Sequence, residues 1–303
     1  MRMKMFFNQL IIKIIPYLPF FIIRLVAGRY VAGETIEDAL KVVKTLNDKG
    51  FSATIDILGE HTRDINTSKE ITNSYKILLK NIFSSNLDCN LSIKPSHIGM
   101  DINNECIDSN LSKLIETARR CNNFIRIDME DSKLTDATIL LYKRFKEQYS
   151  QIGIVLQACL HRSENDFLSL QELPDFNFRL CKGIYRESPK ISFHKKQTIN
   201  NNFLKLLRFA FENKIYIGIA THDLSLIKES YNLINKMNIP NDYFEFQVLY
   251  GVPMSGWLAK LREDNYKVRV YVPFGHDWYD YSVRRLKENP NIAGYVLSNL
   301  FRK

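Results

Sequence analysis

The sequence lacks the patterns that identify metal centres and dinucleotide-binding sheets. Its five cysteines form no Cys-x-x-Cys motif and have no metal-ligand spacing with the six histidines, so we expect no metal site. No Gly-x-Gly-x-x-Gly follows the first predicted strand, where Gly59, Glu60 and His61 stand instead, which argues against an open dinucleotide-binding sheet. Cysteines without a pairing pattern suit a reducing compartment, and we expect a cytoplasmic protein.

The sequence also lacks an apolar run near the ~20 residues that a membrane-spanning helix needs. Residues 1–27 are basic and very apolar, but charged residues and prolines interrupt them, and no small-residue cleavage site of a signal peptide follows. The interrupting residues are Lys13, Pro16, Pro19 and Arg24. Two interpretations stay open: a helical arm packed on the main domain, or an amphipathic segment lying on the inner face of a membrane.

No single tract carries the positive charge of the chain. The formal net charge is +9, yet basic and acidic residues are interleaved nearly everywhere except in the first 30 residues and at Lys195 and Lys196. Nucleic-acid binding usually needs a concentrated basic patch, so we expect no nucleic-acid partner. An acidic ligand is compatible with this charge.

Eight short apolar runs, separated by polar loops and helical stretches, dominate the chain. Nearly continuous apolar runs are typical of parallel strands covered on both faces. Eight strand–helix units in about 250 residues have the size of a (β/α)₈ TIM-type barrel, with a doubly wound open sheet as the alternative. The predicted strands are 51–57, 89–94, 124–129, 153–159, 178–182, 216–221, 244–250 and 267–272.

We expect residues 46–303 to form this barrel as the catalytic domain and residues 1–45 to form an N-terminal helical arm. Thr35 is a plausible N-cap, and apolar residues at helical spacing follow it until Gly50 closes the helix.

Polar residues gather at the ends of the predicted strands, where barrels of this kind carry out their chemistry. Cations outnumber acids among them, so the predicted cavity should bind an anion. The cations are Lys94, Arg179, Lys182, Arg284 and Arg285, and the acids are Asp128 and Glu288.

Arg284, Arg285 and Glu288 lie on a predicted helix just after the last strand. Arg284 and Glu288 share a helix face, whereas Arg285 lies about 100° round the helix. Both arginines reach one target only if this helix crosses the mouth of a pocket. A guanidinium holds a carboxylate or phosphate through two parallel hydrogen bonds, although a solvated helix face is the alternative. The residues alone predict a barrel enzyme for a small carboxylate or a phosphate-bearing cofactor and leave the reaction open.

Several segments at the strand ends also match a known family in their order. They are Tyr30-Val31-Ala32-Gly33-Glu34-Thr35, Asp56-Ile57-Leu58-Gly59-Glu60, Leu91-Ser92-Ile93-Lys94, Arg126-Ile127-Asp128-Met129-Glu130-Asp131, Gly153-Ile154-Val155-Leu156-Gln157, Arg179-Leu180-Cys181-Lys182-Gly183-Ile184-Tyr185-Arg186-Glu187, Ala220-Thr221-His222-Asp223, Phe244-Glu245-Phe246-Gln247-Val248-Leu249-Tyr250-Gly251 and Arg269-Val270-Tyr271-Val272-Pro273-Phe274-Gly275. Together with Arg284 and Arg285, these segments resemble proline dehydrogenase, the flavin-dependent enzyme that oxidises proline. The size is similar to that of the monofunctional bacterial form.

The resemblance implies a distorted (β/α)₈ barrel with FAD at its C-terminal mouth and L-proline stacked on the flavin. Lys94, Arg284 and Arg285 would hold the proline carboxylate, with Glu288 beside them. Asp128 would orient the cations, Arg179 would lie near flavin N5, and Tyr250 would form a wall of the pocket, with Tyr185 as a further candidate. The residues expected to contact FAD are Met129, Gln157, Lys182, Gly183, Ile184, Thr221 and His222.

The implied reaction is hydride transfer from proline C5 to flavin N5, which gives 1-pyrroline-5-carboxylate and starts proline catabolism to glutamate. The electrons would pass to a quinone, and the N-terminal arm would offer a membrane contact. Ile184 departs from the family pattern, because alanine is usual there. Two other functions stay open: a flavin-independent, aldolase-like barrel with Lys94 or Lys182 as a Schiff base, and a non-catalytic membrane-surface protein.

Overall fold

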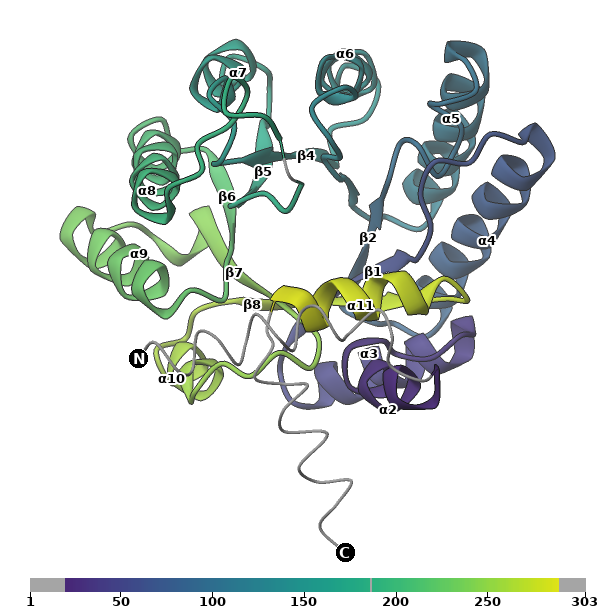
Figure 1. The fold of residues 1–303 in the computed structure, drawn as a ribbon, viewed down its shortest axis with the longest axis horizontal. Helices are drawn as coiled ribbons and strands as arrows, with labels where there is room; N and C mark the ends of the chain where they lie inside the picture. Colours follow the sequence, from purple (N-terminus) through teal and green to yellow (C-terminus); the bar gives the residue numbers. More distant parts are fainter. Residues whose placement is uncertain (1–19, 186, 289–303) are drawn as a thin grey trace, which may run out of the picture.

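The computed structural model describes residues 20–185 and 187–288. Its eight parallel strands form a closed barrel in which the strand order follows the chain and β8 pairs with β1 (Figure 1). This confirms the predicted barrel and excludes the open sheet. The strands are β1 (Ser52–Ile57), β2 (Cys89–Ile93), β3 (Ile125–Ile127), β4 (Ile152–Gln157), β5 (Asn177–Cys181), β6 (Tyr216–Ala220), β7 (Phe244–Leu249) and β8 (Val268–Phe274).

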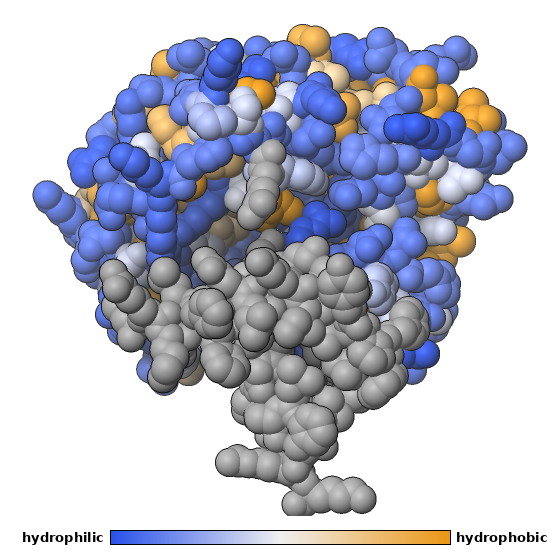
Figure 2. Space-filling model, in the orientation of Figure 1, coloured by the Kyte–Doolittle hydropathy of each residue, from blue (hydrophilic) through white to orange (hydrophobic). Residues whose placement is uncertain are grey.

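Helices surround the ring of strands (Figure 1). Most of them follow a strand and cover its outer face. They are α2 (Phe20–Tyr30), α3 (Ile36–Asp48), α4 (Ile65–Ser84), α5 (Asn104–Arg120), α6 (Thr135–Lys146), α7 (Ser163–Leu170), α8 (Lys196–Glu212), α9 (Leu224–Met237), the 3₁₀ turn η2 (Asn241–Tyr243), α10 (Trp257–Glu263) and α11 (Trp278–Glu288). The visible surface is mainly hydrophilic, with hydrophobic residues in small groups (Figure 2).

Short-range signals define the first of the predicted helices. The Thr35 side chain accepts a hydrogen bond from the Asp38 backbone N–H, and Asp38 in turn accepts from the backbone of Thr35, so the two residues form a capping box. Gly50, at φ +76°, ends the turn that follows α3. Both predictions about this helix are confirmed, and α3 spans the expected domain boundary at residue 45.

The main core lies between the strands and the surrounding helices. All six residues of β4 are buried, as expected for a strand covered on both faces. The barrel interior differs from that expectation, because charged side chains occupy it. Arg179 of β5 contacts Gln247 of β7 and Asp128 after β3, which belong to non-adjacent strands and can meet only inside the ring.

Helices α2 and α3 pack on the barrel at the β8–β1 side, where α11 also lies (Figure 1). The part of the expected arm that starts at residue 20 is therefore helical and packed on the main domain. The rest of the arm, residues 1–19, lies outside the described residues. Across 20–185 and 187–288, none of the helices combines the length and the apolar character needed to cross a membrane.

Candidate active site

A cavity of about 780 Å³ opens at the carboxyl ends of the strands. It has the size of a site for a small molecule or cofactor. Twelve of the fourteen predicted site residues line it, from strands and loops far apart in the sequence. They are Lys94, Asp128, Met129, Gln157, Arg179, Lys182, Gly183, Ile184, Thr221, His222, Arg284 and Arg285, and the further candidate Tyr185 joins them.

Of the other two predicted residues, Tyr250 does not appear in this lining. Strand β7 ends at Leu249, so Tyr250 lies in the turn beyond it and packs partly buried against the main core. Tyr271 of β8 and Leu249 line the cavity instead. Glu288 belongs to α11, but its side chain lies outside the described residues.

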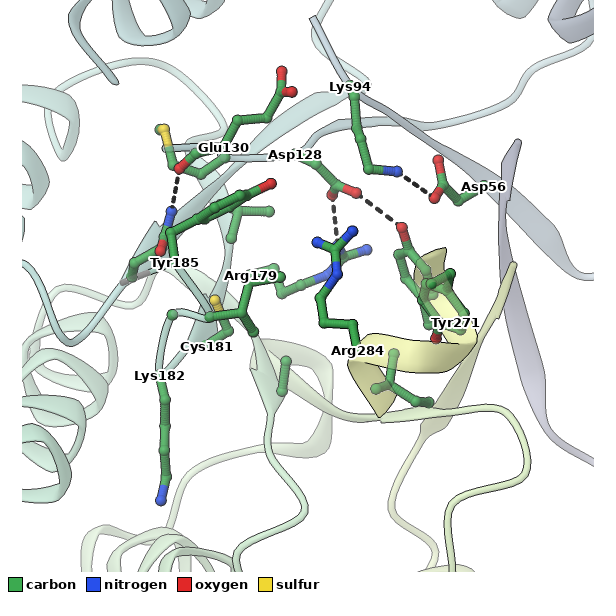
Figure 3. Close-up of a pocket in the computed structure, with 18 of the residues that line it drawn as sticks. Asp56, Lys94, Asp128, Glu130, Arg179, Cys181, Lys182, Tyr185, Tyr271 and Arg284 are labelled. Atoms are coloured by element: carbon green, nitrogen blue, oxygen red, sulfur yellow. Dashed lines mark hydrogen bonds and ion pairs between the residues drawn. The ribbon is translucent and has the colours of Figure 1, made fainter. Parts of the chain in front are cut away.

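Asp128 and Arg179 form the buried centre of the site. Arg179 Nη1 donates to Asp128 Oδ1 at 2.7 Å, and the Ser92 hydroxyl donates to the same oxygen at 2.6 Å. The Tyr271 hydroxyl donates to Asp128 Oδ2 at 3.1 Å, while the Arg179 guanidinium lies over the Tyr271 ring (Figure 3). Both oxygens of Asp128 are engaged, so this carboxylate orients its neighbours.

Lys94 forms a second buried ion pair in the cavity wall. Its ammonium donates to Asp56 Oδ2 at 2.5 Å (Figure 3). Burial alone would lower the pKa of Lys94, but the carboxylates of Asp56 and Asp128 outweigh burial and raise it. Lys94 therefore carries its positive charge at neutral pH.

Helix α11 brings the two adjacent arginines to the same cavity, as the sequence required for a shared target. Arg284 Nη2 lies 3.6 Å from Glu60 Oε1, and the Tyr185 hydroxyl donates to Glu60 Oε2 at 3.5 Å. Arg284 is about a third exposed, whereas Arg285 is buried. In Figure 3 the Arg284 guanidinium points toward the cavity centre.

Gly183 allows a close turn beside β4. Its φ is +97°, and a Cβ there would lie 2.3 Å from Cys159 Sγ and 2.7 Å from Gln157 Oε1, so no larger residue fits. The neighbouring Lys182 extends away from the Asp128 centre and pairs with Asp223 at 2.5 Å (Figure 3). The family resemblance implied this glycine as a contact of FAD.

Gln157 and His222 have defined hydrogen-bond roles in the cavity wall. Gln157 Nε2 donates to the Glu130 carbonyl at 2.7 Å. His222 Nε2 accepts a hydrogen bond from the Leu249 backbone N–H at 2.8 Å, so this nitrogen carries no proton. Burial, helped by the charge of Arg285, lowers the pKa of His222 to about 4. The imidazole is therefore neutral at pH 7.

The expectation of a mostly cationic cavity is wrong. Five basic residues line it, but so do seven acidic ones: Asp56, Glu60, Asp128, Glu130, Asp223, Asp277 and Asp280. Sequence reasoning missed the pairing because the partners lie far apart in the chain, as with Asp56 and Lys94. Asp56, Glu60 and Tyr271 stood in the family-like segments, and that was the signal that could have found them.

Across the described ranges, no group of three or more His, Cys, Asp or Glu side chains is arranged to hold a metal ion. This cavity instead combines guanidinium, ammonium and carboxylate groups with neutral hydrogen-bonding side chains.

Sequence comparison identifies the family. A family model described as proline dehydrogenase matches residues 39–296. The chain belongs to the proline dehydrogenase family. It is 36% identical over 280 residues to proline dehydrogenase 1 of Bacillus subtilis subsp. natto, with 92% of each chain covered. Proline dehydrogenase of Deinococcus radiodurans is 32% identical, with 91% of this chain and 90% of that one covered.

The chain matches the Bacillus and Deinococcus enzymes over about nine tenths of their length. It spans only 24% of the bifunctional protein PutA of Escherichia coli, at 27% identity. Among solved structures, proline utilization A from Bdellovibrio bacteriovorus aligns with a TM-score of 0.81 at 24% identity, covering 87% of this chain and 32% of that one. At that identity the structural likeness supports the shared barrel fold.

Proposed function

We propose that this member of the proline dehydrogenase family oxidises L-proline to 1-pyrroline-5-carboxylate with FAD bound in the cavity. The observation that carries the proposal is the meeting of Arg284, Arg285 and Lys94 in one cavity. These three cations come from two regions of the chain about 190 residues apart, and all of them can donate to a carboxylate.

The mixed charge of the lining suits a zwitterion better than a simple anion. Proline carries a carboxylate and an ammonium group, so its binding needs cations and acids within one small space. The carboxylate would be held by Lys94, Arg284 and Arg285, with Glu288 beside them. The acidic neighbours would receive the ammonium group before it loses its proton.

The residues present fit FAD. The turn at Gly183 leaves no room for a side chain beside Gln157. Gln157, Arg179 and Thr221 offer neutral and charged hydrogen-bonding groups along one side of the cavity. Met129 supplies an apolar wall. We propose that FAD is held by Met129, Gln157, Arg179, Lys182, Gly183, Ile184, Thr221 and His222. Lys182 would do so without leaving Asp223 unpaired, because Lys196 also contacts Asp223 at 2.9 Å.

The chain's own residues would bind and orient the substrate. Asp128 fixes Arg179 and Tyr271 from opposite oxygens, and Tyr185 and Tyr271 would limit the position of the proline ring. When bound, FAD would supply the hydride acceptor, N5, for the hydride on proline C5. The amine must be neutral for its lone pair to support this step, so kcat/KM should rise with pH. A flat profile from about pH 6 to 9 would contradict the mechanism.

The structure offers little support for an aldolase-like function. A Schiff-base lysine must be neutral to attack a carbonyl. Both candidates, Lys94 and Lys182, are ion-paired at 2.5 Å with Asp56 and Asp223, and the pKa of Lys94 is raised.

The remaining parts of the proposal concern the acceptor and the arm. We propose a quinone as electron acceptor, residues 1–45 as an N-terminal arm of the catalytic barrel (46–303), and a cytoplasmic protein that contacts the inner face of the membrane through this arm. Deleting residues 1–19, which leaves α2 intact, should abolish binding to anionic liposomes. Equal binding by both forms would contradict the membrane contact.

The deciding experiment is spectroscopic. The purified protein should be yellow, absorb at about 450 nm, and be bleached by L-proline under anaerobic conditions. D-alanine, which has a carboxylate but no ring, serves as the control and should leave the absorbance unchanged. A colourless protein that FAD does not reconstitute would overturn the proposal.

A further inference from the structure

Helix α2 packs on two segments that border the cavity. Ile23 and Ala27 of α2, with Val31 just after it, form a buried apolar cluster with Trp278 of α11 and Leu58 of the loop after β1. Ile23 has no exposed surface, and Leu58 also lines the cavity. In Figure 1, α2 and α11 lie on the same side of the barrel, and they are in contact. One helix from the start of the described chain thus joins its last helix to the first β-strand loop.

Polar contacts connect the residues just after α2 to those just before α11. Glu34 accepts a hydrogen bond from Trp278 Nε1 at 3.0 Å and lies 3.4 Å from His276 Nδ1. Two backbone bonds join the same segments, since Ala32 N–H donates to the Pro273 carbonyl and Gly275 N–H donates to the Gly33 carbonyl. These contacts fix the place where α11 begins.

The C-terminal end of α2 is also held closely. The Arg29 carbonyl approaches Gly251 so closely that a Cβ at Gly251 would lie 1.8 Å from it. Arg29 Nε donates to the Gly251 carbonyl at 3.3 Å. Since Gly251 follows β7, α2 contacts the segments after β1, β7 and β8 at once.

Two of these segments carry the partners of one ion pair across the cavity mouth. Glu60 lies two residues after Leu58, and Arg284 lies on the helix that begins at Trp278. A helix moves as a unit, so a shift of α11 away from α2 would move Arg284 and Arg285 together. The position of both arginines therefore depends on the cluster around Ile23.

We propose that α2 positions α11 against the loop after β1, and that Ile23 is a positioning residue for Arg284 and Arg285. The effect on proline rests on the proposed function, in which these arginines bind the proline carboxylate. The positioning itself does not. The competing interpretation is that α2 only adds stability to the barrel.

Hydrogen exchange of the full-length holoenzyme tests the positioning directly. Ile23→Ala removes buried methyl groups beside Trp278, so the amides of α11 should exchange about tenfold faster while those of α9, on another side of the barrel, stay unchanged. Gly28→Ala is the matched control, because Gly28 is exposed on α2 and a Cβ there meets nothing within 4 Å. Exchange in α11 equal to that of the control would overturn the proposal.

Kinetics then separate positioning from simple destabilisation. In Ile23→Ala, KM for proline should rise about 5- to 10-fold with kcat within about twofold, as for typical coupling between sites. The Kd of the oxygen-ring analogue of proline, which keeps the carboxylate and has no amine to oxidise, should rise by the same factor. Ile23→Val should restore most of the affinity.

An unchanged KM and Kd in Ile23→Ala, together with a lower melting temperature, would show that α2 is only a stabilising element and would overturn the proposal. Faster exchange in α11 in a protein that never oxidises proline would support the positioning and refute the proposed function, so the two failures are distinguishable.

Discussion

The barrel interior holds two buried charge networks that differ in how their charges are satisfied. The mouth network, formed by Asp56, Lys94, Asp128, Arg179 and Tyr271, lines the cavity. The floor network, formed by Arg126, Asn177, Glu245 and Arg269, does not border it. Gln247 joins them, because it accepts from Arg179 Nε at 2.6 Å and donates to Glu245 Oε1 at 2.6 Å.

The charged groups of the floor network are paired within the protein, although Glu245 Oε2 accepts no hydrogen bond and only lies 3.7 Å from Lys267 Nζ. Arg269 Nε donates to Glu245 at 2.8 Å, and its Nη1 donates to the Ala53 carbonyl at 2.6 Å. Arg126 donates to the Ile154 and Asn177 carbonyls and to the Asn177 side chain, and burial lowers its pKa to about 9. The mouth network uses the same kinds of group, but it faces a cavity in which a ligand can add contacts. Inward-facing strand residues therefore stabilise the barrel in the floor network and are available to a ligand in the mouth network.

The largest effect should come from removing the carboxylate of Glu245, which belongs to the floor network. Glu245→Gln leaves the Arg269 guanidinium buried without its counter-ion, which should lower the free energy of unfolding by about 3–5 kcal/mol. Activity per folded molecule should change little. Urea unfolding measures the first effect and flavin-normalised turnover the second.

Asp88→Asn is the control for this variant. Asp88 also faces Arg269, at 3.9 Å, but its side chain is 60% exposed, and exposed ion pairs contribute little. If both variants lost the same stability, the floor network would not be the buried, internally paired element described above.

The mouth network should respond in the opposite way. Arg285→Ala should lower kcat/KM for proline by a factor that corresponds to about 2–4 kcal/mol of lost transition-state stabilisation. A charge-assisted hydrogen bond to the carboxylate is lost, and the anion is left poorly paired. The free energy of unfolding should change much less than in Glu245→Gln. Arg285→Lys, which keeps the charge but not the paired geometry, should lie between wild type and alanine. A KM within twofold of wild type in Arg285→Ala would refute the assignment of proline.

The sequence predicted the parts of the fold whose signals are local. The eight strands were found as short apolar runs, and the Thr35 cap was found because its hydrogen bond spans only three residues. The strand-end rule of parallel barrels then gathered most site residues without any knowledge of their contacts.

What the sequence could not predict depends on the direction in which a side chain points. Two tyrosines illustrate this: Tyr250 lies beyond the end of β7 at Leu249 and is not in the cavity lining, whereas Tyr271, in the middle of β8, is. The floor charges Arg126, Glu245 and Arg269 lie inside runs that look apolar overall. The alternation of inward-facing and outward-facing side chains along these strands was therefore overlooked. The acids of the mouth were missed because ion pairs such as Asp56–Lys94 join residues 38 apart.

Acid should affect His97, whose backbone N–H donates to the carbonyl of Lys94 in the mouth network, at a higher pH than it affects the floor network. His97 lies behind the mouth with its ring against Gly59, and burial lowers its pKa to about 3. As pH falls below the unfolded-state pKa of about 6.5, the unfolded chain binds a proton that the folded protein does not, so stability falls. From pH 7 to 5 this loss should be about 2 kcal/mol.

His97→Asn should remove this loss, as measured by urea unfolding at the two pH values. The floor behaves differently, because Arg269 outweighs burial and lowers the pKa of Glu245 to about 2. Its contribution is present above an unfolded pKa of about 4.3 and is lost only as pH falls toward 2. Equal pH dependence of wild type and His97→Asn between pH 7 and 5 would contradict the burial of a neutral histidine here.

The smallest effect should come from one hydroxyl of the mouth network. Tyr271→Phe removes the bond to Asp128 Oδ2 and keeps the ring beneath the Arg179 guanidinium. It should lower kcat/KM by a factor that corresponds to about 1 kcal/mol, which is the usual contribution of a single hydrogen bond. Tyr231→Phe is the matched control, because it removes a tyrosine–aspartate bond of 2.6 Å to Asp264 on the outside of the barrel. The control should lower the free energy of unfolding by a similar amount and leave kcat/KM unchanged. Equal effects of the two variants on kcat/KM would contradict the orienting role of Asp128. The hydrogen bond to its Oδ2 would then matter no more for substrate binding than a bond to a surface carboxylate.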